Sequence, residues 1–148
     1  MKHQLLTFCI GEQFLGVDIM AVREIRAWAP TTLIPNAPEH IKGVVNLRGS
    51  VLPVIDLSCR LGWGRIDAQE RHVIIVVDIG GSLHGLFVDA VNDIVTVNNQ
   101  DLQSPPAVAG HKAVDLLQGV ASIDDRMVML LTLDKLVEHD EAPDRIAA

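Results

Sequence analysis

The 148-residue sequence is poor in aromatic residues and in cysteine, and it contains no tyrosine. Three Phe and two Trp are its whole aromatic content, so a folded core has to be built from aliphatic side chains. Single-stranded nucleic acid is commonly bound by stacking on aromatic rings, which this chain scarcely offers. Cys9 and Cys59 are too few for a disulfide framework, and no CxxC pair is present to hold a metal. We therefore expect reduced thiols, no metal and no cofactor.

Long apolar runs and basic clusters are also missing. The first apolar run, Leu5–Ile10, is too short for a signal peptide, and no later run approaches the roughly 18 residues of a membrane span. The formal net charge of −7 argues against a protein that binds phosphate backbones through clustered Lys and Arg. Residues 1–70 carry seven basic and seven acidic groups, so the excess lies in residues 71–148, which end in an acidic tail over 139–148. We expect a cytoplasmic protein with no nucleic-acid partner and no direct membrane insertion.

The chain is rich in β-branched aliphatic residues, with 18 Val and 13 Ile against 17 Leu. Such side chains favour the pleated, half-buried surface of β-strands. Short apolar or alternating runs bounded by turn residues predict about ten strands, near residues 4–10, 13–18, 22–28, 43–47, 51–56, 71–79, 82–88, 91–97, 117–122 and 127–132. Helical signals are brief and cover residues 19–22, 57–61 and 134–139. The pattern predicts an all-β protein.

An internal repeat organises these strands. A shift of 69 places residues 7–25 over 76–94, and a shift of 76 places residues 43–57 over 119–133. Glycine, alanine, valine and isoleucine positions coincide in the first block, and Gly43, Val44 and Leu57 coincide with Gly119, Val120 and Leu133 in the second, which favours a true duplication. A seven-residue insertion in the second long connection explains the change of shift.

The repeat predicts one domain, 1–148, made of two similar five-stranded subdomains, 1–69 and 70–138. Each subdomain is too small to seal its own core, so we expect the two to pack on each other. The sequence leaves open whether the subdomains exchange strands.

Residues suited to catalysis do not form a recognisable constellation. None of the six histidines has a partner at the i, i+4 spacing of a zinc-binding helix. Cys9 lies in an apolar strand without the electropositive setting of a nucleophile. Asp56, Asp78 and Asp89 stand at strand ends, where aspartate commonly accepts hydrogen bonds from turn amides. We expect a protein that is not an enzyme, with a small Cys/His hydrolase as the distant alternative.

A binding surface is better supported by the segment 41–57, which predicts two strands about a tight turn with Arg48 at its tip. The planar guanidinium of an arginine can hold a carboxylate or a carbonyl of a partner. Val22 and Glu24 follow a strand edge in the first unit, and Val91 is the repeat mate of Val22. A groove between the units would suit an amphipathic helix. A solvated turn arginine and core-packed valines are the alternatives.

Several short motifs between residues 4 and 137 occur in the order and spacing of a known family. They are Phe8, Gly16–Ile19, Val22–Ile25, Ile34–Pro38, Ile41–Gly43, Asn46–Gly49, Pro53–Leu57 and Val88–Val91. Together they closely resemble the CheW family, the coupling proteins of bacterial chemotaxis arrays. The resemblance implies two SH3-like five-stranded β-barrel subdomains packed together, with short helices that include one at the C-terminus.

The same resemblance implies a non-enzymatic adaptor that couples the cytoplasmic signalling tips of chemoreceptors to the regulatory domain of the histidine kinase CheA. Further CheW-like units are expected as partners, together with recruitment to membrane-associated arrays. The positions that match the family's receptor-binding residues are Val22, Glu24, Arg48, Val91 and Ile94. Those that match its kinase-facing surface are Lys42 and Gly43.

A second pathway fits the resemblance equally well, because the same module can serve a CheA-like kinase of a type IV pilus or another surface-motility system. The chain also departs from the family's usual pattern at Trp28 and in the connection Gly62–Gln69. Neither departure touches the motif residues, but both bear on which partner is preferred.

Overall fold

The computed structural model describes residues 2–67, 69, 71–105 and 115–137. The strands in this part of the chain are β1 (Lys2–Ile10), β2 (Gln13–Asp18), β3 (Val22–Ala27), β4 (Ile41–Leu47), β5 (Ser50–Asp56), β6 (Val73–Ile79), β7 (Ser82–Val88), β8 (Ala90–Asn98), β9 (Leu117–Ile123) and β10 (Arg126–Leu131). Short helices are η1 (Ile19–Ala21), α1 (Leu57–Arg60), η2 (Asn99–Asp101) and α3 (Leu133–Leu136). The all-β prediction is confirmed, and every expected strand has a counterpart in the structure.

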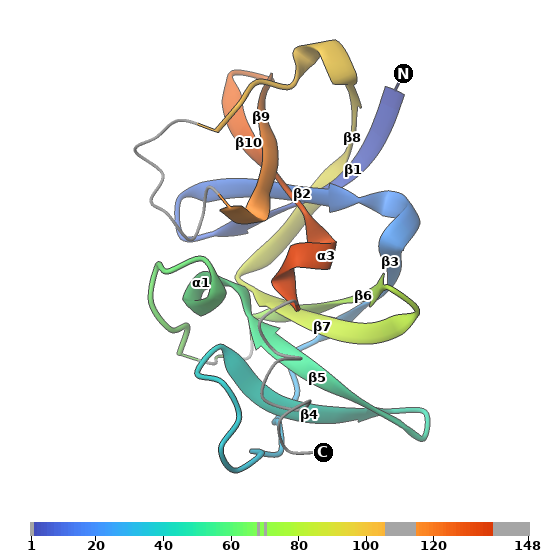
Figure 1. The fold of residues 1–148 in the computed structure, drawn as a ribbon, viewed down its shortest axis with the longest axis vertical. Coiled ribbons are helices and arrows are strands. Elements are labelled where there is room, and N and C mark those ends of the chain that lie inside the picture. Colours follow the sequence, from blue (N-terminus) through green and yellow to red (C-terminus); the bar gives the residue numbers. More distant parts are fainter. Residues whose placement is uncertain (1, 68, 70, 106–114, 138–148) are drawn as a thin grey trace.

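The ten strands form two five-stranded sheets, which Figure 1 shows one above the other. The first has the order β8-β1-β2-β10-β9, and the second has the order β3-β6-β7-β5-β4. Each order becomes the other when every strand is replaced by its repeat mate, such as β6 for β1. Hairpin β1–β2 therefore lies with β8–β10, and hairpin β6–β7 lies with β3–β5. The sequence halves exchange their first hairpins, whereas the boundary between 1–69 and 70–138 stays a prediction from the repeat.

One parallel pairing in each sheet joins the exchanged hairpin to its host strands. Leu130 of β10 pairs with Gly16 of β2, and Val54 of β5 pairs with Gly85 of β7. A Cβ atom on Gly85 would lie 2.8 Å from Cγ2 of Ile74, closer than real Cβ contacts come. The repeated glycine thus gives the interior side chains room at the junction.

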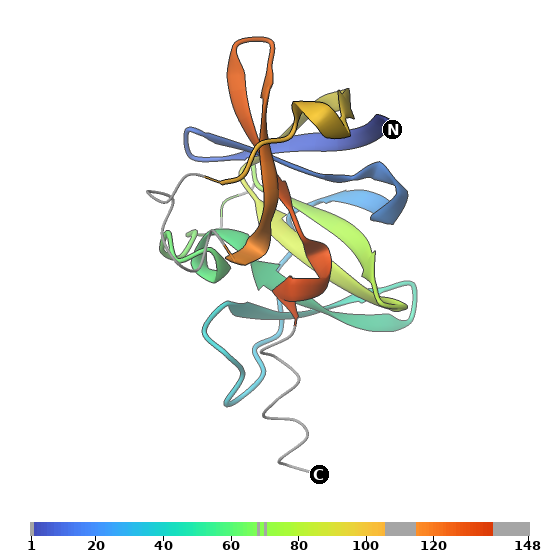
Figure 2. The ribbon, with the colours of Figure 1, turned by 45° about the horizontal axis from the view of Figure 1, so that its top comes forward.

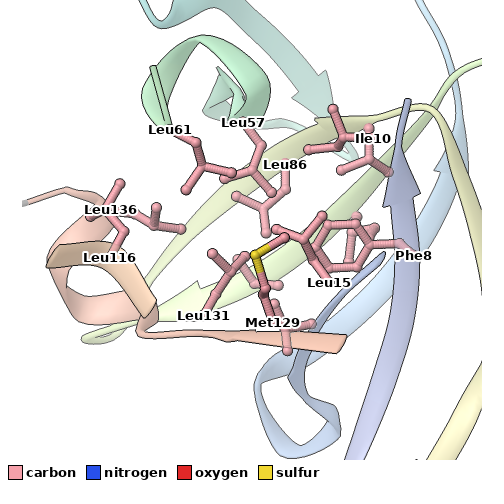
Figure 3. Packing of buried hydrophobic residues seen from close by; sticks show 14 of the residues in the cluster. Phe8, Ile10, Leu15, Leu57, Leu61, Leu86, Leu116, Met129, Leu131 and Leu136 are labelled. Carbon is pink, nitrogen blue, oxygen red and sulfur yellow. The ribbon is translucent and has the colours of Figure 1, made fainter. Parts of the chain in front are cut away.

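The largest hydrophobic cluster is shared by the two sheets and the short helices α1 and α3. Figure 3 shows Phe8, Leu15, Leu57, Leu86 and Leu136 converging from β1, β2, α1, β7 and α3. All five side chains are fully buried. Because this core takes side chains from both sheets, neither sheet can bury its inner face alone.

Each sheet also has a small cluster of its own. In the second sheet the members are Leu47, Leu52, Val54, Ile74, Val76 and Phe87, and in the first sheet they are Leu5, Val97, Ala121 and Leu130. Val54 and Leu130 are repeat mates, as are Ile74 and Leu5. The duplication seen in the sequence is therefore repeated in the packing.

The strand-end aspartates behave as the sequence indicates. Asp78 and Asp89 accept hydrogen bonds of 2.9 and 2.6 Å from the turn amides of Gly81 and Gly11, whereas Asp56 caps helix α1 by accepting 3.1 Å from the Cys59 amide. Helix α3 (Leu133–Leu136) is followed by Val137 as its C-cap, so the helix expected over 134–139 ends earlier than predicted; residue 138 and the acidic tail 139–148 lie outside the described residues. Within the described part of the chain, no helix has the length and apolarity needed to cross a membrane.

Candidate interaction surfaces

Arg48 occupies the tip of the β4–β5 hairpin, as the sequence predicts. Arg48 and Gly49 have φ angles of 51° and 88°, and the side-chain oxygen of Asn46 accepts a 2.8 Å hydrogen bond from the Gly49 amide. Two consecutive residues with positive φ are typical of tight two-residue hairpins, where Asn and Gly are usual. An arginine in the left-handed region costs about 1–2 kcal/mol, and its side chain is 75% exposed. The fold therefore keeps the Arg48 guanidinium exposed to solvent at a conformational cost.

Glu24 of β3 links this hairpin to the edge of the second sheet. Its two carboxylate oxygens lie 2.5 Å from Nη2 of Arg48 and 3.2 Å from Nη1 of Arg26. The structure thus brings together two of the residues assigned to the receptor face, and it adds Arg26, which sequence reasoning missed. One carboxylate between two guanidinium groups leaves a net positive charge on this surface, which we call the arginine face (Glu24, Arg26 and Arg48).

Strands β3 and β8 are edge strands, and each has one hydrogen-bonded neighbour among the described strands. Val22 and Val91 sit at matching positions on them, partly buried against the shared core. Ile94 on β8 and its repeat mate Ile25 on β3 are 56% and 47% exposed. Both edges therefore present an isoleucine to solvent next to a half-buried valine. Ile25 was missed from the sequence, although its alignment with Ile94 in the repeat was the signal that pointed to it.

The second unit lacks the ionic contact of the first. Asp93 and Asp124 are the repeat mates of Glu24 and Arg48, so two acids replace the acid–base pair. Asp93 is held instead by Thr7, whose hydroxyl donates 2.6 Å to the carboxylate and accepts 3.1 Å from the Asp93 amide. The two hairpin tips project from different ends of the molecule in Figures 1 and 2. The arginine face is therefore confined to one of the two repeat units within the described residues.

The side chain of Lys42 is less exposed to solvent than expected for a lysine that contacts a partner. Its ammonium donates 2.7 Å to the carbonyl oxygen of Ile66, lies 3.8 Å from a carboxylate oxygen of Asp56, and stands 4.8 Å from the ring centre of Phe87. The side chain is only 20% exposed. The ammonium is thus satisfied within the fold, and the assigned role of Lys42 in kinase binding stays a prediction.

Gly43 is required by a close approach of the chain. Its φ is 145°, and a Cβ atom there would lie 2.4 Å from the carbonyl oxygen of Thr32. Thr32 forms an isolated antiparallel bridge with Val44, and Gln103 forms the matching bridge in the other unit with Val120. Gly43 therefore serves the docking of the connection between β3 and β4, and its kinase-facing role also stays a prediction.

Apolar side chains gather around these residues on the surface. Leu33 and Ile34 are exposed on the β3–β4 connection. They line a cavity of about 500 Å³ whose wall also includes Lys42, Asp56 and Arg65. A second groove, of about 750 Å³, is mainly apolar and is lined by Ile10, Trp63, Ile66, Val120, Met127 and Met129 among others. Both surfaces have the apolar character that suits protein docking.

Cys9 and His72 show no sign of catalytic tuning. Burial raises the pKa of the Cys9 thiol, and the nearby Asp89 carboxylate raises it further, so the reactive thiolate is disfavoured. Burial also lowers the pKa of His72, whose ring lies 3.3 Å from Asp89. Among the described residues, no three His, Cys, Asp or Glu side chains are grouped to hold a metal ion.

Comparisons with known proteins identify the family. A family model described as the CheW-like domain matches residues 4–141. The chain belongs to the CheW family. A chemotaxis protein CheW from Rhizobium meliloti is 45% identical over 139 residues, which cover 94% of this chain and 90% of the relative. The family resemblance seen in the sequence is thereby confirmed.

Two further CheW-family comparisons broaden this result. The crystal structure of the scaffolding protein TtCheW from Thermoanaerobacter tengcongensis has a TM-score of 0.83 and 34% identity, and covers 93% of this chain and 89% of that one. Protein FrzA of Myxococcus xanthus is 31% identical over 139 residues, covering 93% of this chain and 86% of the relative. The two CheW relatives are named as a chemotaxis protein and a scaffolding protein, and the chain, as a member of their family, is a scaffold and not an enzyme.

Proposed function

We propose that this CheW-family chain couples the cytoplasmic signalling tips of chemoreceptors to the regulatory domain of the kinase CheA, within membrane-associated arrays that contain further CheW-like units. Its role is passive, because receptor state reaches the kinase through contacts and no bond is made or broken here. The observation that carries the proposal is the exposed Arg48, held at a conformational cost at a hairpin tip. Backbone strain of this kind is often retained where it serves a function.

The receptor face combines the arginine face with the edge-strand residues Val22, Val91 and Ile94. The half-buried valines and the exposed isoleucine offer an apolar surface on which one face of a receptor helix can pack. The positive arginine face then selects an acidic side chain at the margin of that helix. In protein–protein interfaces a few anchor residues carry most of the binding free energy, and arginine is enriched among them.

Substitution of Arg48 tests the receptor face. We expect Arg48→Ala to weaken binding of a receptor signalling-tip fragment by about 1–3 kcal/mol, measured by titration calorimetry. Arg65→Ala is the matched control, because Arg65 is also exposed and ion-paired, with Glu39, away from the hairpin tip. Equal receptor affinity in a folded Arg48→Ala variant and in wild type would remove Arg48 from the interface.

The kinase-facing surface is proposed around Lys42 and Gly43. Its support is the exposed apolar pair Leu33 and Ile34, which line the same cavity as Lys42. A pull-down with the isolated CheA regulatory domain tests this surface. We expect Leu33→Asp to lose kinase capture while receptor capture persists, and loss of both would indicate misfolding.

A CheA-like kinase of a type IV pilus or another surface-motility system is the second candidate partner. The similarity to FrzA, a relative that does not carry the CheW name, fits this candidate. Co-purification from the native cell, with identification of the receptor and the kinase caught together, separates the two pathways.

A further inference from the structure

We infer that Lys42 is a positioning residue of the proposed kinase-facing surface, which sets the place of two neighbouring chain segments without touching the partner itself. The inference rests on the proposed function for its consequence in binding. The contacts that carry it lie within this chain.

Lys42 and Asp56 together grip both polar backbone groups of Ile66. The Lys42 ammonium donates to the Ile66 carbonyl over 2.7 Å, and the Ile66 amide donates to Asp56 over 2.8 Å. Asp56 also accepts from the amide of Cys59 and so caps helix α1. Its side chain is 2% exposed, and one of its carboxylate oxygens lies 3.8 Å from the Lys42 ammonium. The lysine–aspartate pair therefore fixes one point of the segment that follows α1.

That segment borders both cavities, because Arg65 lines the 500 Å³ cavity beside Lys42 and Ile66 lines the 750 Å³ groove. Ile66 packs against both the shared core and the cluster of the second sheet, so its position is coupled to both. Trp63, three residues earlier, lines the 750 Å³ groove together with Ile66. The Trp63 amide donates 2.8 Å to the carbonyl of Ser58, which ties the other end of the segment to α1. A shift of Ile66 would therefore move the Trp63 wall of the groove.

The backbone of Lys42 holds a second segment on its other side. The Thr31 hydroxyl donates 3.1 Å to the Lys42 carbonyl, and Thr32 pairs with Val44 through two backbone hydrogen bonds of 2.9 Å. This is the connection that continues into the exposed Leu33. Lys42 thus lies between the two segments, and its ammonium is already engaged by Ile66 and Asp56.

A positioning lysine and a contacting lysine differ in their response to salt. A charge that meets the partner at the rim of an interface loses its effect as salt rises, because exposed pairs are screened. A lysine that acts through buried contacts changes affinity at low and high salt alike. Removal of the Lys42 ammonium should also change the free protein, because the segment that carries Trp63 is then released before any partner binds.

The experiment uses the full chain with Trp28→Phe, which leaves Trp63 as its single tryptophan. In this background we expect Lys42→Met to shift the Trp63 emission maximum and to speed amide exchange at Ile66 about tenfold. Affinity for the CheA regulatory domain should fall about tenfold in both 50 mM and about 500 mM salt, while receptor-tip binding is unchanged. Lys42→Arg, which keeps a charged donor, should restore part of the kinase affinity. Lys2→Met, which removes an exposed lysine of β1, is the surface-charge control.

Because Lys42→Met leaves Asp56 buried without its cation, Lys42→Met with Asp56→Asn is the second variant, and it should show the same free-protein changes. Loss of kinase affinity with unchanged Trp63 emission and Ile66 exchange would overturn the inference and make Lys42 a direct contact. Changed emission and exchange with full kinase affinity would overturn it as well. Failure of the wild-type chain to bind the kinase domain would instead refute the proposed function, and the two free-protein readouts would still test the positioning.

Discussion

His72 is a buried residue whose two ring nitrogens face different groups. Its Nδ1 accepts a 2.9 Å hydrogen bond from the Gln69 amide, which places the proton of the neutral ring on Nε2. Nε2 lies 3.3 Å from a carboxylate oxygen of Asp89 but is not aligned for a hydrogen bond. Burial lowers the pKa of His72, and Arg71 lowers it further, with Asp89 acting in the opposite direction. The folded protein therefore holds this imidazole neutral more strongly than the unfolded chain does.

This difference predicts a loss of stability on acidification. Below the unfolded pKa of about 6.5, the unfolded chain binds a proton at His72 that the folded protein does not take up. The free energy of unfolding should then fall as the pH drops from about 6.5 toward the lower folded pKa, and His72 should have no effect above about pH 7.5. His72→Gln keeps a hydrogen-bond acceptor but cannot titrate.

Urea unfolding at pH 7.5 and 5.5 tests the prediction, with His72→Gln as the comparison. We expect the wild type to lose more stability between the two pH values than the variant does. An equal loss in both proteins would show that other groups govern the acid response.

Residues could be assigned from the sequence only where their surroundings are local. The turn at Arg48 follows from its neighbours Asn46 and Gly49, and the structure has it at the tip. The partner of Lys42 could not be predicted, because Ile66 is 24 residues away and offers only a backbone carbonyl, which leaves no mark in a sequence. A lysine on a strand reads as a surface charge until the tertiary contact is known.

At the scale of elements, the two repeated glycines of β2 and β7 show how the hairpins join their host sheets. Gly16 and Gly85 lie at the parallel pairings. At each of them a side chain of a neighbouring strand, Leu5 or Ile74, lies close to the glycine. A Cβ on Gly85 would lie 2.8 Å from Ile74, whereas one on Gly16 would lie 3.3 Å from Leu5. The second junction is therefore the tighter of the two.

We predict that Gly85→Ala destabilises the fold by about 1–3 kcal/mol, as overpacking of a filled core does. Gly16→Ala should cost clearly less, because Leu5 has only to yield by a few tenths of an ångström. Thermal or urea unfolding of the two variants measures the difference. A larger loss for Gly16→Ala would contradict the packing described for the two junctions.

The short helices α1 and α3 are joined by hydrogen bonds that no local sequence pattern predicts. The buried Arg60 donates 2.9 Å hydrogen bonds from Nε to the Leu136 carbonyl and from Nη2 to the Lys135 carbonyl. These carbonyls lie in the last turn of α3, where backbone acceptors lack partners within the helix. Both helices were expected from the sequence, but the clasp between them depends on residues about 75 positions apart.

At the scale of the whole molecule, the repeat predicted two similar sets of five strands but not which strands share a sheet. Alternating and apolar runs indicate that a segment is a strand, whereas pairing partners are set by packing across the chain. In the structure β1–β2 and β6–β7 change places between the two sets. The hairpin exchange could therefore not be predicted from the sequence, although the number of strands and the packing of the two units on each other could be.

The exchange predicts that the two halves of the chain depend on each other for folding. Without residues 70–148, strand β3 lacks β6 and strand β5 lacks its parallel partner β7. The shared core would also lose Leu86 and Leu136, so the buried faces of Phe8 and Leu57 would meet water. A unit of this size with half a core cannot offset the entropy of ordering its backbone.

We therefore expect the fragments 1–69 and 70–148 to be unfolded when each is prepared alone, as judged by circular dichroism and amide dispersion in NMR spectra. Mixed together, they should associate, regain the spectrum of the intact chain and lose it in a single urea transition, because each fragment supplies the hairpin that completes the other's sheet. The intact wild-type chain is the reference for that transition. A fragment 1–69 that unfolds cooperatively by itself would mean that the first unit closes its own sheet, against the hairpin exchange.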